Sequence, residues 1–491
     1  MERVEGILGA SSRSLNIPDR ALNSSANPTS VQLGANWAKM GGQAAPDYST
    51  IRLMTGSAAA EIVERLKARG YQAYLVGGCV RDLLLGLEPK DFDVATSARP
   101  EEVVCLFPNA RLVGAHFGVA LVSTGGEDVE VATFRSDHAY RDGRRPTAVE
   151  FEIDPRQDVL RRDFTINGLL MDPASREVLD FVGGRGDLEA RLIRAIGDPE
   201  TRFAEDHLRM LRAVRFAARL GFDIEPATFA AIERQRGKIR LISAERVRDE
   251  LACILTEGGA RRGFELLDAS GLLSEILPEV AAMKGVEQPP EFHPEGDVWT
   301  HTLMMLEGLR SPSFTLALGV LLHDVGKPPT FRTADRIRFD GHAEVGAHMA
   351  VRILSRLHCS NQEIRQVESL VANHLRFKDV RKMRESTLKR FLRQEGFPEH
   401  LELHRLDCAM SHRLLDNYEF VKRKSEELPV EALKPARLIT GHDLIAAGYR
   451  SGPAFRRMLA ALEDAQLEGQ IQTPEEAITW VRARFQPPDG E

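Results

Sequence analysis

A glycine turn between a short apolar strand and a helix, followed by two closely spaced aspartates, constrains this chain more than any other feature. The stretch reads Tyr74-Leu-Val-Gly-Gly-Cys-Val-Arg-Asp82, and Asp91-Phe-Asp93 begins ten residues after Arg81. We expect a strand, a turn, a short helix and a second strand. Residues two apart on a strand point to the same face, so Asp91 and Asp93 are expected to share a divalent ion. The turn leaves backbone N–H groups free for phosphate.

Metal-binding carboxylates beside a phosphate cradle are the parts that phosphoryl or nucleotidyl transfer requires. An isolated Asp-x-Asp pair is more often a solvated turn. Here the pair follows a helix that carries Arg81, whose guanidinium can bind a triphosphate through two parallel hydrogen bonds. We expect Asp82 to pair locally, and we interpret Asp91 and Asp93 as catalytic Mg²⁺ ligands.

Bulk composition sets the class of protein. The 491 residues are enough for two to four domains, and the 43% hydrophobic and 28% charged content is that of a soluble globular protein. A net charge of −7 excludes a uniformly basic coat for nucleic acid but allows a local basic groove. The five cysteines have no paired spacing, which suits the reducing cytoplasm. Neither a secretory signal nor an apolar run near the roughly 20 residues of a membrane span is found, so we expect a cytoplasmic protein without a membrane partner.

Periodicity predicts an α+β protein with a mixed α/β head, a sheet of five strands or a similar number, and all-helical parts after it. Helical patterns with Arg and Leu dominate beyond Asp198, and Pro289-Pro290 is a plausible boundary. The expected segments are a disordered extension at 1–55, the head at 56–190, a helical neck and body at 191–288, a histidine-rich helical unit at 289–415 and a helical tail at 416–491.

A second motif, Arg161-Arg162-Asp163, precedes the apolar segment that starts at Phe164. It could be only a helix cap with surface charge. The functional interpretation places Arg162 on the sugar or phosphates of a nucleotide, with Asp163 fixing the site.

A third motif steps by three residues through Asp206, Arg209, Arg212 and Arg215. A solvated, salt-bridged helix face is the simpler interpretation of such a run. Base reading has a specific rationale, however. Cytosine and adenine each offer an amino donor beside a ring-nitrogen acceptor, whereas uracil and guanine present the reverse order. A carboxylate beside a guanidinium, such as Asp206 with Arg209, would accept the first two bases and reject the others.

In this order, the three motifs resemble the class II nucleotidyltransferases of the polymerase-β superfamily, which are the tRNA CCA-adding enzymes and the bacterial poly(A) polymerases. The resemblance covers about residues 70 to 285. It implies tRNA, CTP and ATP as partners and Mg²⁺ held by Asp91 and Asp93. It also implies that the nucleotide is bound by Gly78, Arg81, Arg162, Asp163, Asp206, Arg209, Arg212 and Arg215.

The resemblance leaves the product open between a CCA end and a poly(A) tail. Bacterial poly(A) polymerases typically carry a Gly-Arg-Arg-Phe type of segment where this chain has Gly114-Ala-His-Phe117, which favours CCA addition. An enzyme that adds only A stays open. The basic loop Ser136–Thr147 resembles the family's flexible loop and makes a CC-only enzyme the least favoured. Glu130 is either a third active-site carboxylate or an ordinary strand acid.

Histidines gather in the second helical unit, which resembles the HD metal-dependent phosphohydrolase domain over about residues 291 to 415. Imidazole and carboxylate ligands can activate water on a divalent metal of unspecified identity. The resemblance implies a first shell of His301, His323, Asp324 and Asp407. His342 and His374 are candidates for a second metal or a substrate phosphate, and Lys327 for a phosphate contact or a helix cap.

Two functions of other classes compete with nucleotide addition. In one, the HD unit is the working hydrolase and the head is a nucleotide sensor. In the other, the chain is a catalytically dead RNA-binding protein, against which the complete Asp-x-Asp pair and the full series from Asp206 to Arg215 speak.

Overall fold

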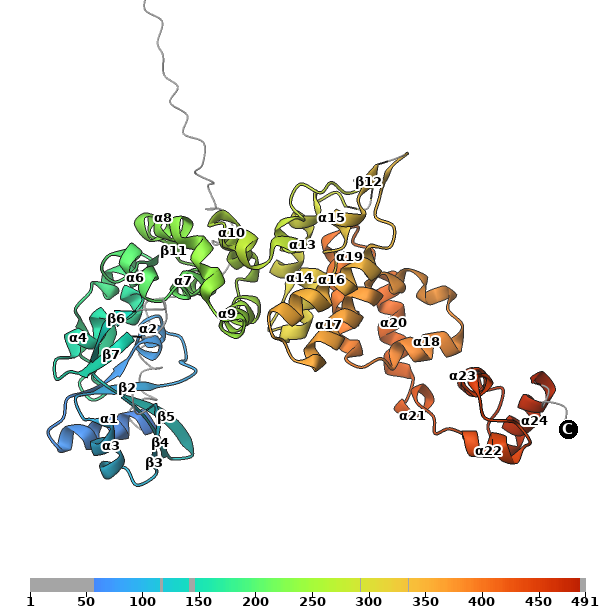
Figure 1. Ribbon diagram of the computed structural model, residues 1–491, viewed down its shortest axis with the longest axis horizontal. Coiled ribbons are helices and arrows are strands. Elements are labelled where there is room, and N and C mark those ends of the chain that lie inside the picture. Colours follow the sequence, from blue (N-terminus) through green and yellow to red (C-terminus); the bar gives the residue numbers. More distant parts are fainter. Residues whose placement is uncertain (1–56, 115–117, 141–145, 292, 334, 486–491) are drawn as a thin grey trace, which may run out of the picture. The chain divides into compact units, whose positions relative to one another are not determined.

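The computed structural model describes residues 57–114, 118–140, 146–291, 293–333 and 335–485 (Figure 1). The predicted extension at 1–55 lies outside the described residues. The same holds for residues 115–117 of the segment that favoured CCA addition and for 141–145 of the basic loop.

The head is built on a seven-stranded sheet in the order β3-β4-β5-β2-β1-β8-β9. The prediction of about five strands was too small, because β8 and β9 add to the edge at β1 and are only three residues long, too short to stand out in the sequence. The strands are β1 (Ala73–Val76), β2 (Asp93–Thr96), β3 (Ala110–Gly114), β4 (Val119–Thr124), β5 (Glu127–Thr133), β8 (Leu169–Met171) and β9 (Val178–Asp180).

Short helices and one hairpin surround this sheet. Helix α1 (Ala58–Ala68) buries its apolar face and ends before Gly70, whose φ of +87° suits glycine. A Cβ on Gly184, at the start of α5, would lie 2.2 Å from the carbonyl oxygen of Thr165, so only glycine lets these segments approach. The other elements are α2 (Gly78–Leu84), α3 (Pro100–Leu106), β6 (Arg135–Tyr140), β7 (Pro146–Phe151), α4 (Pro155–Leu160), η4 (Thr165–Asn167) and α5 (Gly184–Glu189).

After α5 the regular elements of the described chain are helices, apart from two pairs of very short strands (Figure 1). These pairs are β10 (Leu192–Ile193) with β11 (Asp223–Ile224), and β12 (Arg332–Thr333) with β13 (Ile337–Arg338). The neck and body comprise α6 (Pro199–Glu205), α7 (Arg209–Leu220), α8 (Pro226–Gln235), η5 (Arg236–Leu241), α9 (Ala244–Thr256), α10 (Ala260–Ala269), α11 (Leu272–Ile276) and α12 (Pro278–Ala281).

The histidine-rich unit follows, and further helices lead to the end of the described chain. They are α13 (Val298–Gly308), α14 (Phe314–Leu322), α15 (Lys327–Thr330), α16 (His342–Arg356), α17 (Asn361–Asn373), η6 (His374–Lys382), α18 (Glu385–Leu392), α19 (Phe397–Met410), α20 (Asp416–Glu427), α21 (Val430–Leu433), α22 (Gly441–Ala446), α23 (Pro453–Leu467) and α24 (Pro474–Arg484). Among the described residues, no helix is long and apolar enough to cross a membrane.

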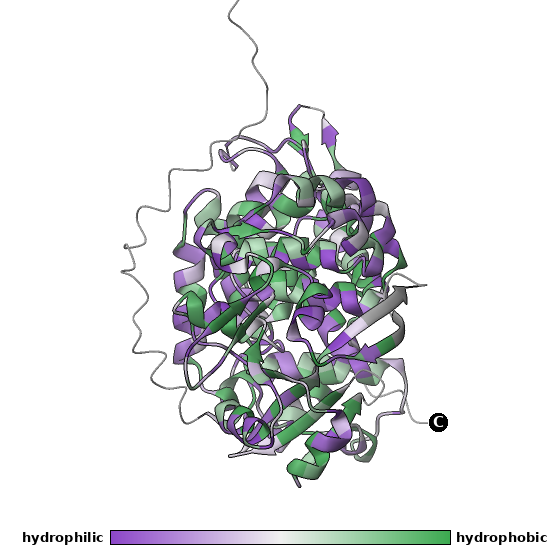
Figure 2. Ribbon diagram, turned by 90° about the vertical axis from the view of Figure 1, so that its left-hand side faces the viewer, coloured by the Kyte–Doolittle hydropathy of each residue, from purple (hydrophilic) through white to green (hydrophobic). Residues whose placement is uncertain are grey.

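Hydrophobic and hydrophilic residues alternate along the strands and helices, as expected for elements with one buried face (Figure 2). A large apolar core extends through the head, the neck and the histidine-rich unit. The helices α22 to α24 have a core of their own around Leu444, Leu462 and Val481. The α+β class with an all-helical continuation is therefore confirmed.

Candidate functional site

Asp93 and Glu130 form the centre of a carboxylate cluster in the head. Asp93 opens β2 and is directly paired with Glu130 on the parallel strand β5, so the two side chains share one face of the sheet. Asp91 precedes the strand, so it does not hold the i and i+2 strand positions that the sequence predicted. Burial, Glu130 and Asp91 nevertheless raise the pKa of Asp93 to about 6, and the carboxylates are thus close enough to repel one another.

This donor set fits a hard divalent cation. Asp91, Asp93 and Glu130 offer only carboxylate oxygens, which Mg²⁺ prefers. Crowded negative charge that raises a carboxyl pKa is relieved when a cation binds. The sequence left open whether Glu130 is an active-site carboxylate or an ordinary strand acid. Its pairing with Asp93 across β2 and β5 makes it part of this cluster.

The glycine turn lies against two arginines. Gly77 has a φ of +79°, and a Cβ on it would be 3.3 Å from Nη1 of Arg162. Arg162 also donates from Nη2 to Asp158, at 2.9 Å, which holds its guanidinium over the turn. The structure therefore brings Arg162 to the glycine motif, although the two are more than eighty residues apart in the sequence.

Arg81 lies inside the protein. Only 2% of it is exposed, and it donates to Asp82 from Nε, at 2.8 Å, and to Asn167 from Nη1, at 2.7 Å. Burial lowers the pKa of Arg81, and the neighbouring Asp82 opposes this effect. Asp82 pairs locally, as expected, and it also accepts from Arg219 at 3.2 Å. A direct triphosphate contact from Arg81 stays a prediction, whereas its hold on Asn167 is a contact that the sequence did not indicate.

Asp163 connects the head to helix α7. Its Oδ1 accepts from the backbone of Phe164, at 2.8 Å, and from Asn167, at 3.1 Å. Its Oδ2 forms an ion pair with Arg212, at 2.7 Å. Burial would raise the pKa of Asp163, but Arg212 and Asn167 outweigh it and lower the pKa to about 2. The carboxylate is therefore ionised at any physiological pH and fixes its neighbours.

Asp206 and Arg209, which the sequence offers as a base-reading acceptor and donor, each have partners of their own in the structure. Helix α6 ends at Glu205 and α7 begins at Arg209, so the predicted continuous helix is broken at Asp206, which caps α6 with extended backbone. Asp206 accepts from Nη2 of Arg246, on α9, at 2.7 Å. Arg209 pairs with Glu205 at 2.6 Å and donates to the carbonyl oxygen of Arg161 at 2.9 Å.

Helix α9 supplies the charges that oppose this motif, and the sequence analysis missed them. Arg246 and Glu250 are four residues apart and share one face of α9. Glu250, which is 6% exposed, lies 3.2 Å from Nε of Arg215 and 3.8 Å from Nη1 of Arg212. The sequence does show Arg246 and Glu250 as an i, i+4 pair of opposite charges on a predicted helix, but nothing in it indicates that this pair contacts α7.

A second cluster surrounds the buried carboxylate of Asp324. Oδ2 lies 3.0 Å from Nε2 of His323 and 2.6 Å from Nζ of Lys327, and Oδ1 lies 3.5 Å from Nε2 of His342 and 3.8 Å from that of His374. Burial would raise the pKa of Asp324, but His323 and Lys327 lower it. These predicted residues therefore converge at one place.

The protonation of these imidazoles fits metal binding. Nδ1 of His323, His342 and His374 lies 2.7–2.8 Å from the carbonyl oxygens of Val320, Phe339 and Val371, respectively. A carbonyl only accepts, so each Nδ1 carries a proton, and each Nε2 faces Asp324, where it could bind a metal ion. This orientation by carbonyls is typical of metal-bound histidines.

His301 and Asp407 complete the cluster. Their Nε2 and Oδ1 atoms are 3.2 Å apart, and Nδ1 of His301 is 2.7 Å from Glu295, which His293 also contacts at 2.8 Å. Burial would lower the pKa of His301, but Asp407 and Glu295 raise it to about 9. Glu295 and His293 were not predicted, although they precede α13 as a His-x-Glu sequence.

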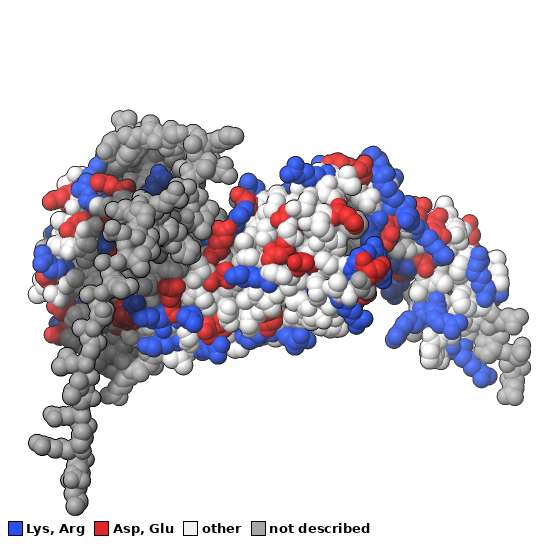
Figure 3. All heavy atoms as spheres, turned by 90° about the horizontal axis from the view of Figure 1, so that it is seen from above, with Lys and Arg blue, Asp and Glu red and all other residues white. Residues whose placement is uncertain are grey.

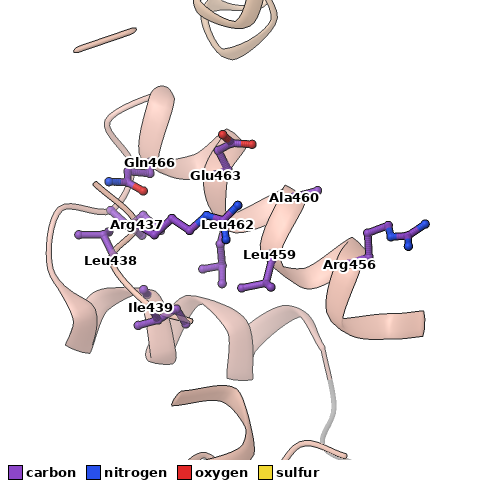
Figure 4. A pocket seen from close by; sticks show the side chains of 11 residues that line it. Arg437, Leu438, Ile439, Arg456, Leu459, Ala460, Leu462, Glu463 and Gln466 are labelled. Atoms are coloured by element: carbon purple, nitrogen blue, oxygen red, sulfur yellow. The ribbon is translucent and has the colours of Figure 1, made fainter. Parts of the chain in front are cut away.

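Two further surfaces lack such chemistry. A pocket of about 260 Å³ beside α23 has Leu459 and Leu462 as its floor and Arg437 and Arg456 at its sides, without a histidine or a pair of carboxylates (Figure 4). On the face seen in Figure 3, basic and acidic side chains are interspersed over the described residues and form no continuous basic coat. The carboxylate cluster and the histidine cluster are therefore the two candidate sites.

Comparison with known proteins gives similarity to nucleotidyltransferases along most of the chain. Residues 73–194 match the "Poly A polymerase head domain" family, residues 221–284 the "Probable RNA and SrmB-binding site of polymerase A" family, and residues 342–481 the family of tRNA nucleotidyltransferase domain 2.

Individual relatives extend this similarity. A CCA-adding enzyme of Lactobacillus johnsonii is 33% identical over 86% of this chain and 96% of its own length. Poly(A) polymerase I of Salmonella typhimurium is 43% identical, but over 45% of this chain and 50% of its own length. The crystal structure of the Bacillus stearothermophilus CCA-adding enzyme with CTP is 28% identical, covers 87% of this chain and 96% of that chain, and has a TM-score of 0.69.

The raised pKa of Asp93 predicts pH-dependent Mg²⁺ binding in the head. A protonated carboxyl group does not bind the ion, so affinity should decrease as the pH falls through about 6. Glu130→Gln removes a negative charge that raises this pKa, so the midpoint of the decrease should move to lower pH. Calorimetric Mg²⁺ titrations over a range of pH, with His323→Ala and Asp324→Ala present in every protein, measure this. Glu127→Gln, at the exposed start of β5, is the matched control; an equal shift for both would contradict the assignment.

Proposed function

The chain belongs to the family of CCA-adding enzymes, and we propose that it adds C, C and A from CTP and ATP to the 3′ end of tRNA without a nucleic-acid template. The observation that carries this function is the Asp93–Glu130 pair with Asp91, beside a glycine turn covered by Arg162. Full-length similarity to a CCA-adding enzyme supports the same conclusion.

The residues of the head divide the work of nucleotidyl transfer. Asp91, Asp93 and Glu130 would hold Mg²⁺, which lowers the pKa of a bound hydroxyl and neutralises charge on the α-phosphate. The turn at Gly77-Gly78 leaves the backbone open to the phosphates, and Arg162 places a cation over it. Asp163 fixes the position of Arg212 relative to the segment of the glycine turn. It binds Arg212 directly, and it binds Asn167, which accepts a hydrogen bond from Arg81.

Base selection belongs to Asp206 and Arg209, which lie at the junction of α6 and α7. Asp206 is the acceptor for the amino group of cytosine or adenine, and Arg209 is the donor for the ring nitrogen. Both are held in place in the described structure, Asp206 by Arg246 and Arg209 by Glu205. These partners hold the carboxylate and the guanidinium each in a fixed orientation. Selection of a base by hydrogen bonding requires such fixed donors and acceptors.

The extent of similarity favours a CCA end over a poly(A) tail. The CCA-adding relative aligns through the helical parts, whereas the poly(A) polymerase relative aligns over 45% of this chain. An enzyme that adds only A remains the alternative, and incorporation of each nucleotide distinguishes the two.

Purified protein with Mg²⁺ and a tRNA that lacks its last three nucleotides should incorporate labelled CTP and ATP but neither UTP nor GTP. Asp93→Ala should abolish incorporation, because the metal-binding carboxylate is lost, while tRNA retention in a gel-shift assay stays near wild type. Asp128→Ala, an exposed acid on β5, should keep full activity. Incorporation by Asp93→Ala would refute the metal assignment, and incorporation of A alone would point to the A-adding alternative.

Asp206→Ala should relax the choice of base, because it removes the acceptor and leaves the metal site intact. We expect the preference for CTP over UTP to fall by roughly 10-fold or more, the effect of about 1.4 kcal/mol for one lost hydrogen bond to a charged group. Ratios of kcat/KM for the four nucleotides measure this. Asp223→Ala, an exposed acid on β11, is the control. A variant that is equally slow with every nucleotide but no less selective would reject base reading by Asp206.

A second activity, metal-dependent phosphoester hydrolysis, is favoured by the convergence of four imidazoles on Asp324 and Asp407. His301, His323, Asp324 and Asp407 would hold the metal, and His342 and His374 lie beside Asp324 for a second ion or a phosphate. Such a metal supplies a hydroxide-like water at neutral pH. Hydrolysis forms a bond from the water oxygen to phosphorus and releases the ribose oxygen as a hydroxyl group with one of the water protons.

His323→Ala combined with Asp324→Ala should remove hydrolysis of a nucleoside 2′,3′-cyclic phosphate and leave nucleotide addition near wild type, because the two sites share no residue. Release of product is followed by chromatography with added Mn²⁺, Ni²⁺ or Mg²⁺. His358→Ala, an exposed histidine outside the cluster, is the control. Loss of both activities would mean that the histidine unit only supports the head.

A further inference from the structure

Segment η6 (His374–Lys382) is a 3₁₀ helix of nine residues, whereas most such helices have three or four. Its side chains repeat every three residues. His374, Phe377 and Val380 are buried and form the stripe that packs inward. The first residue of that stripe is His374 of the histidine cluster, so the geometry of η6 is tied to that site.

The exposed stripe of η6 consists of Leu375, Lys378 and Arg381, and Arg384 follows at the start of α18. Side chains three apart in a 3₁₀ helix are eclipsed, and a rise of about 2.0 Å per residue separates them by roughly 6 Å. The cations therefore stand in line at a spacing close to that of successive phosphates in a single strand. Arg381 is oriented by a hydrogen bond to the carbonyl oxygen of Asp416, at 2.9 Å, and lies over the ring of Phe420.

The inner end of this stripe reaches the histidine site. Leu375 and His374 both line a cavity of about 410 Å³ that also contains Asp324 and Asp407. Across the cavity, Lys327 and two residues of the β12–β13 hairpin, Arg336 and Arg338, line the same space. The cavity therefore has cations on the side of Lys327 and the hairpin, and on its other side Leu375 leads along η6 to Lys378 and Arg381.

We propose that the exposed stripe of η6 binds the backbone of single-stranded RNA whose 3′-terminal phosphate enters the histidine cavity. This inference rests on the proposed hydrolase activity and specifies its substrate class as an RNA end. A solvated charged face would not require the stripe to start at a residue that lines the cavity, or its cations to repeat at the helix period. Phosphate contacts of this kind carry no base preference and weaken with salt.

The test compares hydrolysis of a terminal 2′,3′-cyclic phosphate on an oligonucleotide of about ten residues with that of the mononucleotide. We expect a KM roughly 10-fold lower for the oligonucleotide, and Lys378→Ala with Arg381→Ala should abolish this advantage. Two lost phosphate contacts should reduce the slope of log KM against log salt by about 1.4. Kinetics with the mononucleotide should not change. Lys382→Ala removes the same charge from another face of η6 and should change KM by less than about twofold.

Equal KM values for the two substrates in the unaltered protein, or an equal effect of Lys382→Ala, would overturn the proposal while leaving the hydrolase intact. If neither substrate is hydrolysed, the hydrolase activity is refuted, and binding then tests the stripe. Fluorescence anisotropy of the oligonucleotide ending in a 3′-phosphate should show weaker binding and a smaller salt slope for the double variant than for Lys382→Ala. Identical binding by the two variants would overturn the inference.

Discussion

The ion pair between the buried carboxylate of Asp163 and the partly exposed guanidinium of Arg212 is the contact on which the candidate nucleotide site depends. One oxygen of Asp163 binds Arg212 on α7, and the other binds Asn167, which in turn holds Arg81 of the glycine turn. A single carboxylate thus joins the segment of the glycine turn to helix α7. Loss of Arg212 would leave the buried carboxylate of Asp163 without its charged partner, which is destabilising because a buried charge has lost its hydration. The shape of the site is therefore fixed by charge as much as by apolar packing.

The central carboxylates of the two candidate sites have opposite electrostatic surroundings. In the head, Asp93 is surrounded by like charges, and its raised pKa reflects a place that a cation would stabilise. In the histidine-rich unit, Asp324 is surrounded by imidazoles and Lys327, and its pKa is lowered. The first arrangement suits a hard, weakly held Mg²⁺ and the second a more tightly held metal that prefers nitrogen. The two proposed activities would therefore use two clusters whose donor atoms suit different metals.

Sequence reasoning located both sites because their residues lie in short local motifs. The expected strand before Gly77 and a helix through Arg212 are present in the structure as β1 and α7. It was wrong on the number of strands and on the strand position of Asp91, and it did not indicate the partner of Asp206. Each of these depends on a partner distant in the sequence: β8 needs β1, and Asp206 takes Arg246 from α9. No local pattern encodes which of several arginines a carboxylate will find.

The sequence by itself determined the chemistry: carboxylates after a glycine turn, arginines at helical spacing, and histidines beside an aspartate. These features survive because side-chain type and local spacing are properties of the chain before it folds. Only the tertiary structure decided the pairings, namely that Glu130 joins Asp93, that Arg162 covers Gly77 and that Arg246 and Glu250 oppose the motif on α7. The physical reason is that a buried charge must be compensated by whichever group the packing brings within reach.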